Sequence, residues 1–342
     1  MRITNSMLIN TFIGNLTTNM TKLSDIQNSM TSGKKFAHIS DDPVALIYSQ
    51  QAKYKLSRLA DYTKNVDMAK TWTTQAEAGT MEMNKILVSA YESLIDAATD
   101  IKNESDFTNI SRYIGQLCDH VLDVLNTTIG DKYVYGGYNT TGYADGGKNT
   151  PPFTVDPVTQ NLHYNGVDLT DPANDTIIAK MREDVMTFDV AFGTAMPVTV
   201  NGINFAFYDT APGTPPVNLN IYNLLNDMYN ALTVRTKPDP DNPGEFLPIR
   251  AEDLDVFISD LQKAQNHSLA HTADLGGRAV RLEILESRYS QDELNYTQML
   301  SDAEDADLAE VIMRFSMAEA VYNASLSAGA RIIQPTLMDF LR

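Results

Sequence analysis

The sequence predicts a mainly α protein, a long antiparallel helical rod of the coiled-coil or bundle type that carries a small β-rich inserted domain. Apolar residues recur in alternating steps of three and four in two long segments near opposite ends of the chain, and such a stripe needs a partner helix. Between these segments, short strand-like runs and Asn-Gly turns replace the helical rhythm. With 342 residues and 43% hydrophobic content, the chain can bury two or three cores.

The first predicted helix covers residues 1 to about 36. Its narrow apolar stripe consists of Leu8, Phe12, Leu16, Met20, Leu23, Ile26 and Met30. Ser32-Gly33 supplies its stop, because glycine accepts the left-handed conformation of a helix end. These side chains, at about 2 kcal/mol each when buried, do not offset the cost of ordering roughly thirty residues. We therefore expect this helix to pair with residues 308–332 and to need contacts from neighbouring subunits as well.

The second predicted helix begins at Pro43, after the acidic N-cap Asp42, and runs to about residue 103. Within it, residues 59–101 keep steps of three and four without a break, and most members of this series are apolar or aromatic. Residues 254–303 keep the same rhythm with a few polar lapses. These two stripes predict one antiparallel pair.

A third amphipathic helix over residues 107–124 is expected to end by Gly130. Beyond it, residues 133–137, 162–166 and 198–207 contain strand-like runs. The last two include Asn-Gly, which is typical of hairpin turns. This region therefore predicts a small β-rich insertion.

One helix, from Asn218 to about Leu232, is expected to interrupt the insertion. From Ala251 the chain is expected to be helical nearly to its end, with Gly276-Gly277 as the weakest point. The predicted domains are a terminal helical coiled-coil domain for polymerisation (1–40 and 303–342), a helical rod domain (41–137 and 248–302) and a β-rich outer domain (138–247).

The formal net charge of -18 argues against nucleic acid as a partner, because phosphate binding needs clustered Lys and Arg, and no run of them occurs. Residues 3–21 carry no charge, yet Asn, Thr and Ser interrupt every apolar stretch, so neither a signal peptide nor a membrane-spanning helix is predicted. Cys118 lies in an apolar helical pattern, which indicates a buried thiol.

The sequence contains no pattern that predicts an enzyme, a cofactor or a metal site. His267 and His271 stand four apart on one helix and in principle chelate a metal, but no Glu or Cys companion completes the set. Residues 239–244 resemble the opening of a calcium loop, yet Pro243 occupies a ligand position and Arg250 stands where a bidentate Glu belongs. The sequence also contains no glycine-rich phosphate loop, nucleophile elbow or catalytic-triad order.

Four motifs stand out, namely Met1-Arg2-Ile3-Thr4, residues 30–35 with 39–45, Tyr133-Val134-Tyr135-Gly136-Gly137, and the C-terminal run from Asp307 to Leu341. Together these motifs resemble the flagellin family of bacterial flagella, in particular the members that join hook and filament. The resemblance covers residues 1–140 and 250–342, and the motifs are specific only when taken together.

The resemblance implies a structural subunit that forms a ring between hook and filament, a homo-oligomer in contact with other hook-associated proteins and flagellin. It also implies export to the extracellular flagellum through the flagellar type III apparatus, without a cleaved signal peptide, and a cytoplasmic export chaperone at the C-terminal region. No nucleic acid, membrane or cofactor is implied. The expected polymerisation interface consists of Leu8, Phe12, Leu16, Leu23, Leu308, Phe315, Tyr322, Leu337, Phe340 and Leu341.

Two alternatives are open. Filament flagellin is the first, but flagellin chains usually end in a leucine-rich tail without phenylalanine, whereas this chain contains Phe340. An arginine expected near Glu92 in flagellins is also missing, which puts recognition by the animal flagellin receptor in doubt. The second is a coiled-coil surface protein with a ligand-binding or enzymatic central domain.

Overall fold

The chain divides into two compact units in the computed structural model, Met1–Asp61 with Tyr289–Arg342, and Tyr62–Arg288. The described residues are 5–36, 38, 40–99, 104–145, 148–208, 220–234, 236–238, 246–248 and 251–333. The three-domain division expected from the sequence stays a prediction.

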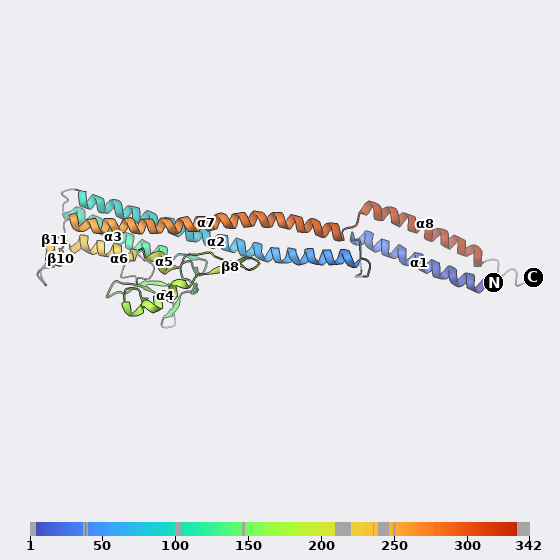
Figure 1. Ribbon diagram of the computed structural model, residues 1–342, viewed down its shortest axis with the longest axis horizontal. Helices are drawn as coiled ribbons and strands as arrows, with labels where there is room; N and C mark the ends of the chain where they lie inside the picture. Colours follow the sequence, from blue (N-terminus) through green and yellow to red (C-terminus); the bar gives the residue numbers. More distant parts are fainter. Residues whose placement is uncertain are drawn as a thin grey trace, which may run out of the picture. The chain divides into compact units, whose positions relative to one another are not determined.

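The fold is mainly α with small antiparallel sheets, as the sequence predicts (Figure 1). The helices are α1 (Asn5–Ser32), α2 (Pro43–Thr99), α3 (Glu104–Leu125), η1 (Pro172–Asn174, a 3-10 turn), α4 (Asp175–Glu183), α5 (Gly202–Ala206), α6 (Ile221–Val234), α7 (Ala251–Glu304) and α8 (Leu308–Ile333). The strands pair as β1 (Thr128–Ile129) with β2 (Lys132–Tyr133), β3 (Tyr143–Asp145) with β4 (Lys148–Thr150), β5 (Phe153–Val155) with β6 (Leu162–Tyr164) and β7 (Val167–Asp168), β8 (Thr187–Ala191) with β9 (Thr194–Pro197), and β10 (Thr236–Pro238) with β11 (Phe246–Pro248). None of the helices in the described part of the chain is both long and apolar enough to cross a membrane.

The predicted start and stop signals act as expected. Asp42 Oδ1 accepts hydrogen bonds from the backbone N–H groups of Val44 (3.1 Å) and Ala45 (2.9 Å), and so caps α2. Gly33, directly after α1, has a φ of 70°, which only glycine adopts without strain.

The long helices α2 and α7 run antiparallel in the unit Tyr62–Arg288. Lys70 Nζ lies 2.6 Å from Glu286 Oε2, and at the other end Gln262 Nε2 lies 3.3 Å from the Tyr91 hydroxyl. The predicted stripe of α2 is buried, and its members include Val66, Ala69, Thr73, Ala76, Thr80, Met83, Leu87, Ala90, Leu94 and Ala97. Polar side chains at this helix contact are hydrogen-bonded across it. The Ser268 hydroxyl donates to Thr80 O (3.2 Å), and the Thr272 hydroxyl donates to Thr80 Oγ1 (3.0 Å).

The β-rich segment packs on α2 through a buried tyrosine. Tyr135 is fully buried and donates its hydroxyl hydrogen to Ala76 O, 2.7 Å away. Gly79 makes room for this ring, since a Cβ there would lie 2.3 Å from the Tyr135 hydroxyl. At the other end of the segment, Asn165 (φ 51°) and Gly166 (φ 78°) form the turn between β6 and β7, so this predicted Asn-Gly hairpin is confirmed.

The second predicted Asn-Gly hairpin, within residues 198–207, is wrong. Asn201 caps a short helix instead: its Oδ1 accepts from Ile203 N (2.9 Å), and α5 follows. Its Nδ2 donates to the carbonyl oxygens of Met181 (2.6 Å) and Asp184 (2.7 Å). These bonds fix Asn201 as a cap, a role that asparagine fills as readily as a turn.

Two further expectations need correction. The C-terminal helix breaks between Glu304 and Leu308, whereas Gly276-Gly277, expected to be its weakest point, lies within α7. The sequence pattern also did not predict α4 or the hairpin β8–β9.

Cys118 is buried as predicted, and burial raises the pKa of its thiol to about 12. The acidic stretch that resembles a calcium loop lies largely outside the described residues.

Candidate assembly surface of the terminal helices

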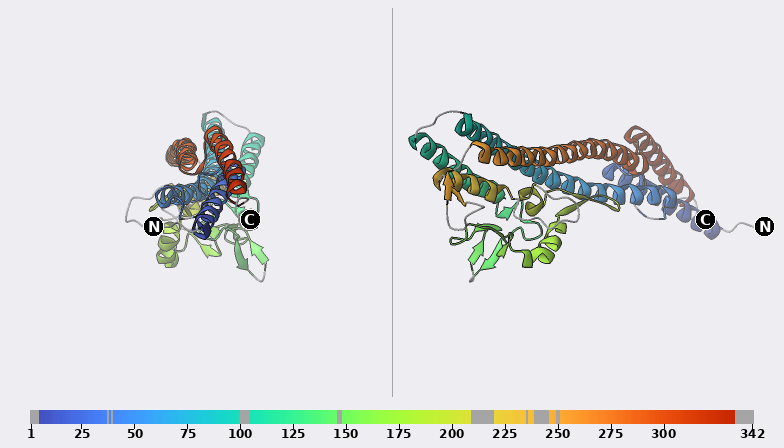
Figure 2. Two further views of the ribbon diagram at one scale, coloured as in Figure 1. Left: turned by 90° about the vertical axis from the view of Figure 1, so that its right-hand side faces the viewer. Right: turned by 60° about the vertical axis from the view of Figure 1, so that its left-hand side comes forward.

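The terminal helices α1 and α8 lie side by side and antiparallel within the unit that holds both chain ends (Figures 1 and 2). Asn19 Nδ2 donates to Ser325 Oγ, 3.1 Å away. Phe12 packs directly over Gly329, where an added Cβ would come within 2.3 Å of the phenyl ring. The pairing of the two chain ends predicted from the sequence is therefore present.

The side chains between the helices are only half buried. On α1 the half-buried residues are Ile9, Phe12, Leu16, Asn19, Leu23, Ile26, Ser29 and Met30, and on α8 they are Val311, Phe315, Ala318, Tyr322 and Ser325. Steps of three and four put each set on one face of its helix, and we call the two sets together the inner seam. One chain leaves part of this seam accessible to water.

The residues predicted for polymerisation divide into three groups. Phe12, Leu16, Leu23, Phe315 and Tyr322 belong to the inner seam, and Leu308 is 51% exposed. The side chain of Leu8 is outside the described ones. Leu337, Phe340 and Leu341 lie beyond the described residues.

A second apolar stripe runs along α8 on the face opposite the inner seam. It consists of Met313, Met317, Ala320 and Ala324, all exposed, and we call it the outer stripe. The steps of four, three and four are those of a helix that packs against another helix. Met313 and Met317 are 58% and 64% exposed, so no described residue covers them. This stripe is not among the predicted interface residues, although the same steps of three and four in the sequence indicate it.

The outward face of α1 is less polar than its sequence indicates. The hydroxyls of Thr11, Thr17, Thr18 and Thr21 each donate to the carbonyl oxygen four residues earlier, at 2.9–3.0 Å. These four hydroxyl donors are therefore satisfied within the helix. Both terminal helices thus present surfaces that can pack against other helices.

A buried carboxylate lies at the break between α7 and α8. Glu304 is 5% exposed, and its Oε2 lies 2.9 Å from Lys34 Nζ, while its Oε1 accepts hydrogen bonds from Lys53 Nζ and Ser49 Oγ. Lys35 N donates to Glu304 O at 2.7 Å. We call this group the Glu304 latch.

The backbone completes the latch. Ala306 N donates to Gly33 O at 2.8 Å, and Lys34 and Asp305 form an isolated antiparallel bridge. The loop after α1 is thereby held against the loop before α8. Burial by itself would raise the pKa of Glu304, but hydrogen bonds from Lys53, Ser49 and Lys34 outweigh it and lower the pKa to about 2.

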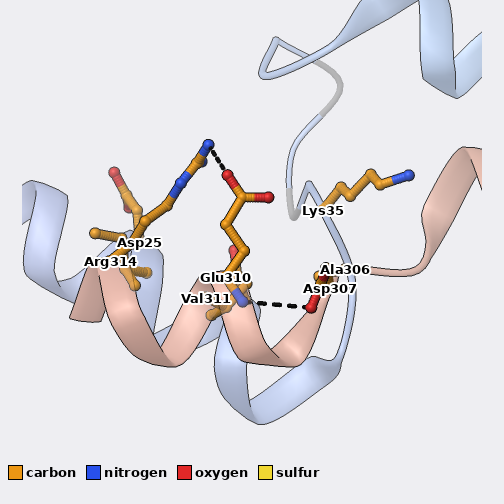
Figure 3. Close-up of a pocket in the computed structure, with 9 residues that line it drawn as sticks. Asp25, Lys35, Ala306, Asp307, Glu310, Val311 and Arg314 are labelled. Atoms are coloured by element: carbon orange, nitrogen blue, oxygen red, sulfur yellow. Dashed lines mark hydrogen bonds and ion pairs between the residues drawn. The ribbon is translucent and has the colours of Figure 1, made fainter. Parts of the chain in front are cut away.

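A cavity of about 370 Å³ lies beside the latch, between α1 and the first turns of α8 (Figure 3). Its lining consists of Asp25, Ile26, Ser29, Lys35, Ala306, Asp307, Glu310, Val311 and Arg314. Glu310 and Arg314 pair at 2.5 Å on its rim. Asp307 Oδ1 accepts from Ala309 N (2.9 Å) and Glu310 N (3.3 Å), so it caps α8. This end of the helix pair is therefore charged, whereas the outer stripe is apolar.

The described residues hold no cluster of three or more His, Cys, Asp or Glu side chains placed to bind a metal. At the start of α8, Asp307 caps the helix, and Glu310 and Arg314 form an ion pair. The arrangement is that of a packing surface.

Comparisons with known proteins agree with this geometry. Residues 3–140 match the family model of the bacterial flagellin N-terminal helical region. The chain is 23% identical over 333 residues to the flagellar hook-associated protein 3 of Escherichia coli (strain K12), with 96% of each chain covered.

Solved structures share the fold. A structure from Vibrio parahaemolyticus, assigned to a flagellar hook-associated protein, has a TM-score of 0.58 at 17% identity and covers 78% of this chain and 100% of its own. The flagellar junction protein FlgL from Legionella pneumophila has a TM-score of 0.52 at 14% identity, with 76% of this chain and 100% of its own covered.

Proposed function

We propose that this chain, a member of the flagellin family, is a structural subunit of the bacterial flagellum that joins the hook to the filament. It is a structural protein and not an enzyme. The observation that carries the proposal is a helix pair, made from the two chain ends, whose outer apolar stripe is uncovered in the single chain. The full-length similarity to hook-associated protein 3 supports the junction role over that of filament flagellin.

The outer stripe is the surface that we assign to contacts between subunits. The inner seam is already used to pair α1 with α8, so on its own it offers a neighbouring subunit only the half-exposed edges of residues such as Phe12 and Tyr322. Met313 and Met317 are exposed, lie one helical turn apart and adapt readily to a partner surface. The predicted interface residues that lie in the inner seam, namely Phe12, Leu16, Leu23, Phe315 and Tyr322, therefore hold the helix pair together, and the outer stripe extends the interface to the next copy.

The proposed partners follow from this role. Copies of the chain form a ring, and the ring contacts other hook-associated proteins on one side and flagellin on the other. The subunit reaches the extracellular flagellum through the flagellar export apparatus, and a cytoplasmic chaperone covers the C-terminal region before export. Such cover is needed because an exposed apolar helix face associates with other apolar surfaces.

Substitution of the outer stripe tests the proposal. Met313→Asp with Met317→Asp places two carboxylates in a contact that excludes water, which costs several kcal/mol per subunit by order of magnitude. We expect a folded monomer that is still secreted, and cells whose flagella stop at the hook under the electron microscope. The matched control is Ser316→Asp with Asn323→Asp, which adds the same charge to exposed positions on the flank of α8. Control cells should swim normally.

Normal filaments in the methionine double variant would refute the outer stripe as an assembly contact. Immunogold labelling of isolated flagella separates the two candidate functions. A single band between hook and filament supports the junction subunit, whereas label along the whole filament would identify a filament flagellin.

A further inference from the structure

We propose that His267 and His271 of α7, together with the backbone carbonyl oxygen of Asn204 in α5, form a binding site for a transition-metal dication of the zinc type. The site lies within the unit Tyr62–Arg288, whereas the assembly surface belongs to the other unit, and it would connect a long helix to the inserted segment. The sequence supplied only the histidine pair. The structure adds the third donor, which is a main-chain atom and therefore invisible in any side-chain motif.

The distances from His267 Nε2 to the other two donor atoms match edges of a metal coordination shell. His267 Nε2 lies 3.2 Å from His271 Nε2 and 2.8 Å from Asn204 O. Around an ion with ligand distances of about 2.0–2.1 Å, neighbouring donors are separated by roughly 2.9 Å in an octahedron and 3.4 Å in a tetrahedron. The rings are nearly perpendicular, at 84°, with centroids 4.5 Å apart.

Two Nε2 atoms and one carbonyl oxygen face one another in this cluster. A neutral imidazole has one N–H group, so the tautomers decide which ring donates to Asn204 O. Burial lowers the pKa of both His267 and His271 and so favours their neutral forms. Neutral imidazole is the form that binds metal. One dication satisfies all three electron-rich atoms at once.

The surroundings decide which metal fits. The donor set contains no carboxylate, so it does not suit Ca²⁺ or Mg²⁺, which prefer oxygen ligands, whereas imidazole nitrogen suits Zn²⁺, Ni²⁺ and Cu²⁺. Arg278 is nearby, but its charge is balanced by Asp274, 2.5 Å away. Arg182 also faces His267 and stacks over the Phe207 ring at 5.1 Å. This uncompensated arginine weakens the attraction for a dication, so we expect a moderate, exchangeable site completed by water.

Metal titration of the untagged full-length chain tests the proposal. Co²⁺ serves as a spectroscopic probe, because its visible absorption bands report the number and kind of ligands, and Zn²⁺ serves for thermal unfolding. We expect one equivalent per chain and a rise in the melting temperature of roughly 5–10 °C at a hundredfold excess of Zn²⁺ over its Kd. The variants His267→Ala and His271→Ala should each lower the affinity at least tenfold.

The matched control is His38→Ala, which removes an exposed histidine outside this site and should leave the titration unchanged. If a variant fails to fold, the Co²⁺ spectrum of the unaltered chain decides, since nitrogen ligation shifts its bands from those of the aqueous ion. An unchanged aqueous spectrum and an unchanged melting temperature would overturn the proposal. Binding that survives in the folded His271→Ala variant would overturn it equally.

Discussion

Replacing Glu304 by glutamine tests whether one buried carboxylate fixes the break between α7 and α8. Glutamine keeps the size of the side chain and one acceptor oxygen but removes the charge that Lys34 and Lys53 share. The two ammonium groups then face a neutral amide in a site where the carboxylate was 7% exposed. We expect the latch to open more often while both helices remain formed.

The magnitude follows from the pKa of Glu304. A value of about 2, against the ordinary 4.5, corresponds to about 3 kcal/mol of preferential stabilisation of the charged form. The lysine side chains are 48% and 43% exposed, so solvent screens part of this interaction. We therefore expect the Glu304→Gln change to cost about 2 kcal/mol, which is about a thirtyfold increase in the population of the open latch.

Two amide hydrogens report the opening directly. Lys35 N donates to Glu304 O and Ala306 N donates to Gly33 O, so both exchange with solvent only when the latch opens. Hydrogen exchange at pH 7, followed by mass spectrometry or NMR, should show about thirtyfold faster exchange at these amides in the variant.

The matched control is Glu286→Gln, which removes the exposed partner of Lys70 in a single surface ion pair of 2.6 Å. Its effect should stay below about 1 kcal/mol. Equal protection of Lys35 and Ala306 in the Glu304→Gln variant and the unaltered protein would refute the latch as the cause of the break.

Three further predictions concern pH and packing. Because the pKa of Glu304 is lowered by folding, its stabilising effect should be complete above about pH 4.5 and should disappear as the pH falls toward 2; urea unfolding of the unaltered protein and the Glu304→Gln variant should therefore converge in that range. Gly329→Ala pushes a Cβ into the phenyl ring of Phe12 and should lower the stability of the α1–α8 pair by about 1–3 kcal/mol. Residues 5–32 should then be cleaved faster by a protease. The control Gly14→Ala has nothing within 4 Å of the added Cβ, so it should leave the stability unchanged or raise it. Tyr135→Phe removes the buried hydroxyl bond to Ala76 O and should lower the free energy of unfolding of the second unit by about 1–2 kcal/mol in urea, and an unchanged value would show that this bond contributes nothing.

The helical part of the fold could be predicted because its signals are local and repeat many times. The stripe on α2 tolerates Thr73 and Thr80 at buried positions, since Thr73 donates to Val198 O and Thr80 bonds across to α7. A stripe with many apolar positions still predicts the helix when a few of its positions are polar. The caps at Asp42 and Gly33 were predictable for the same reason, because each acts within one helical turn.

The inserted segment was harder to predict because a single residue decides between two structures. Asn-Gly forms a hairpin turn at Asn165, but at Asn201 the same dipeptide begins a helix. The difference comes from the carbonyl oxygens of Met181 and Asp184, which lie in another part of the chain and bind the Asn201 side chain. Periodicity also could not locate the carbonyl of Asn204 beside the histidine pair, since a backbone atom carries no sequence signal.

The break between α7 and α8 shows most clearly where local reasoning stops. Residues 303–307 contain no glycine or proline, so intrinsic propensity allows the helix to continue through them. One local signal does exist, because Asp307 followed by Glu310 has the spacing of a helix N-terminus. A cap signal inside a helical run is too weak to stop the run without tertiary help, and the Glu304 latch supplies that help. The break is thus a tertiary structure imposed on a helix-forming sequence, so opening the latch should expose Lys35 and Ala306 without lowering the helix content. A loss of helical circular dichroism in the Glu304→Gln variant would instead mean that the latch holds the terminal helices themselves.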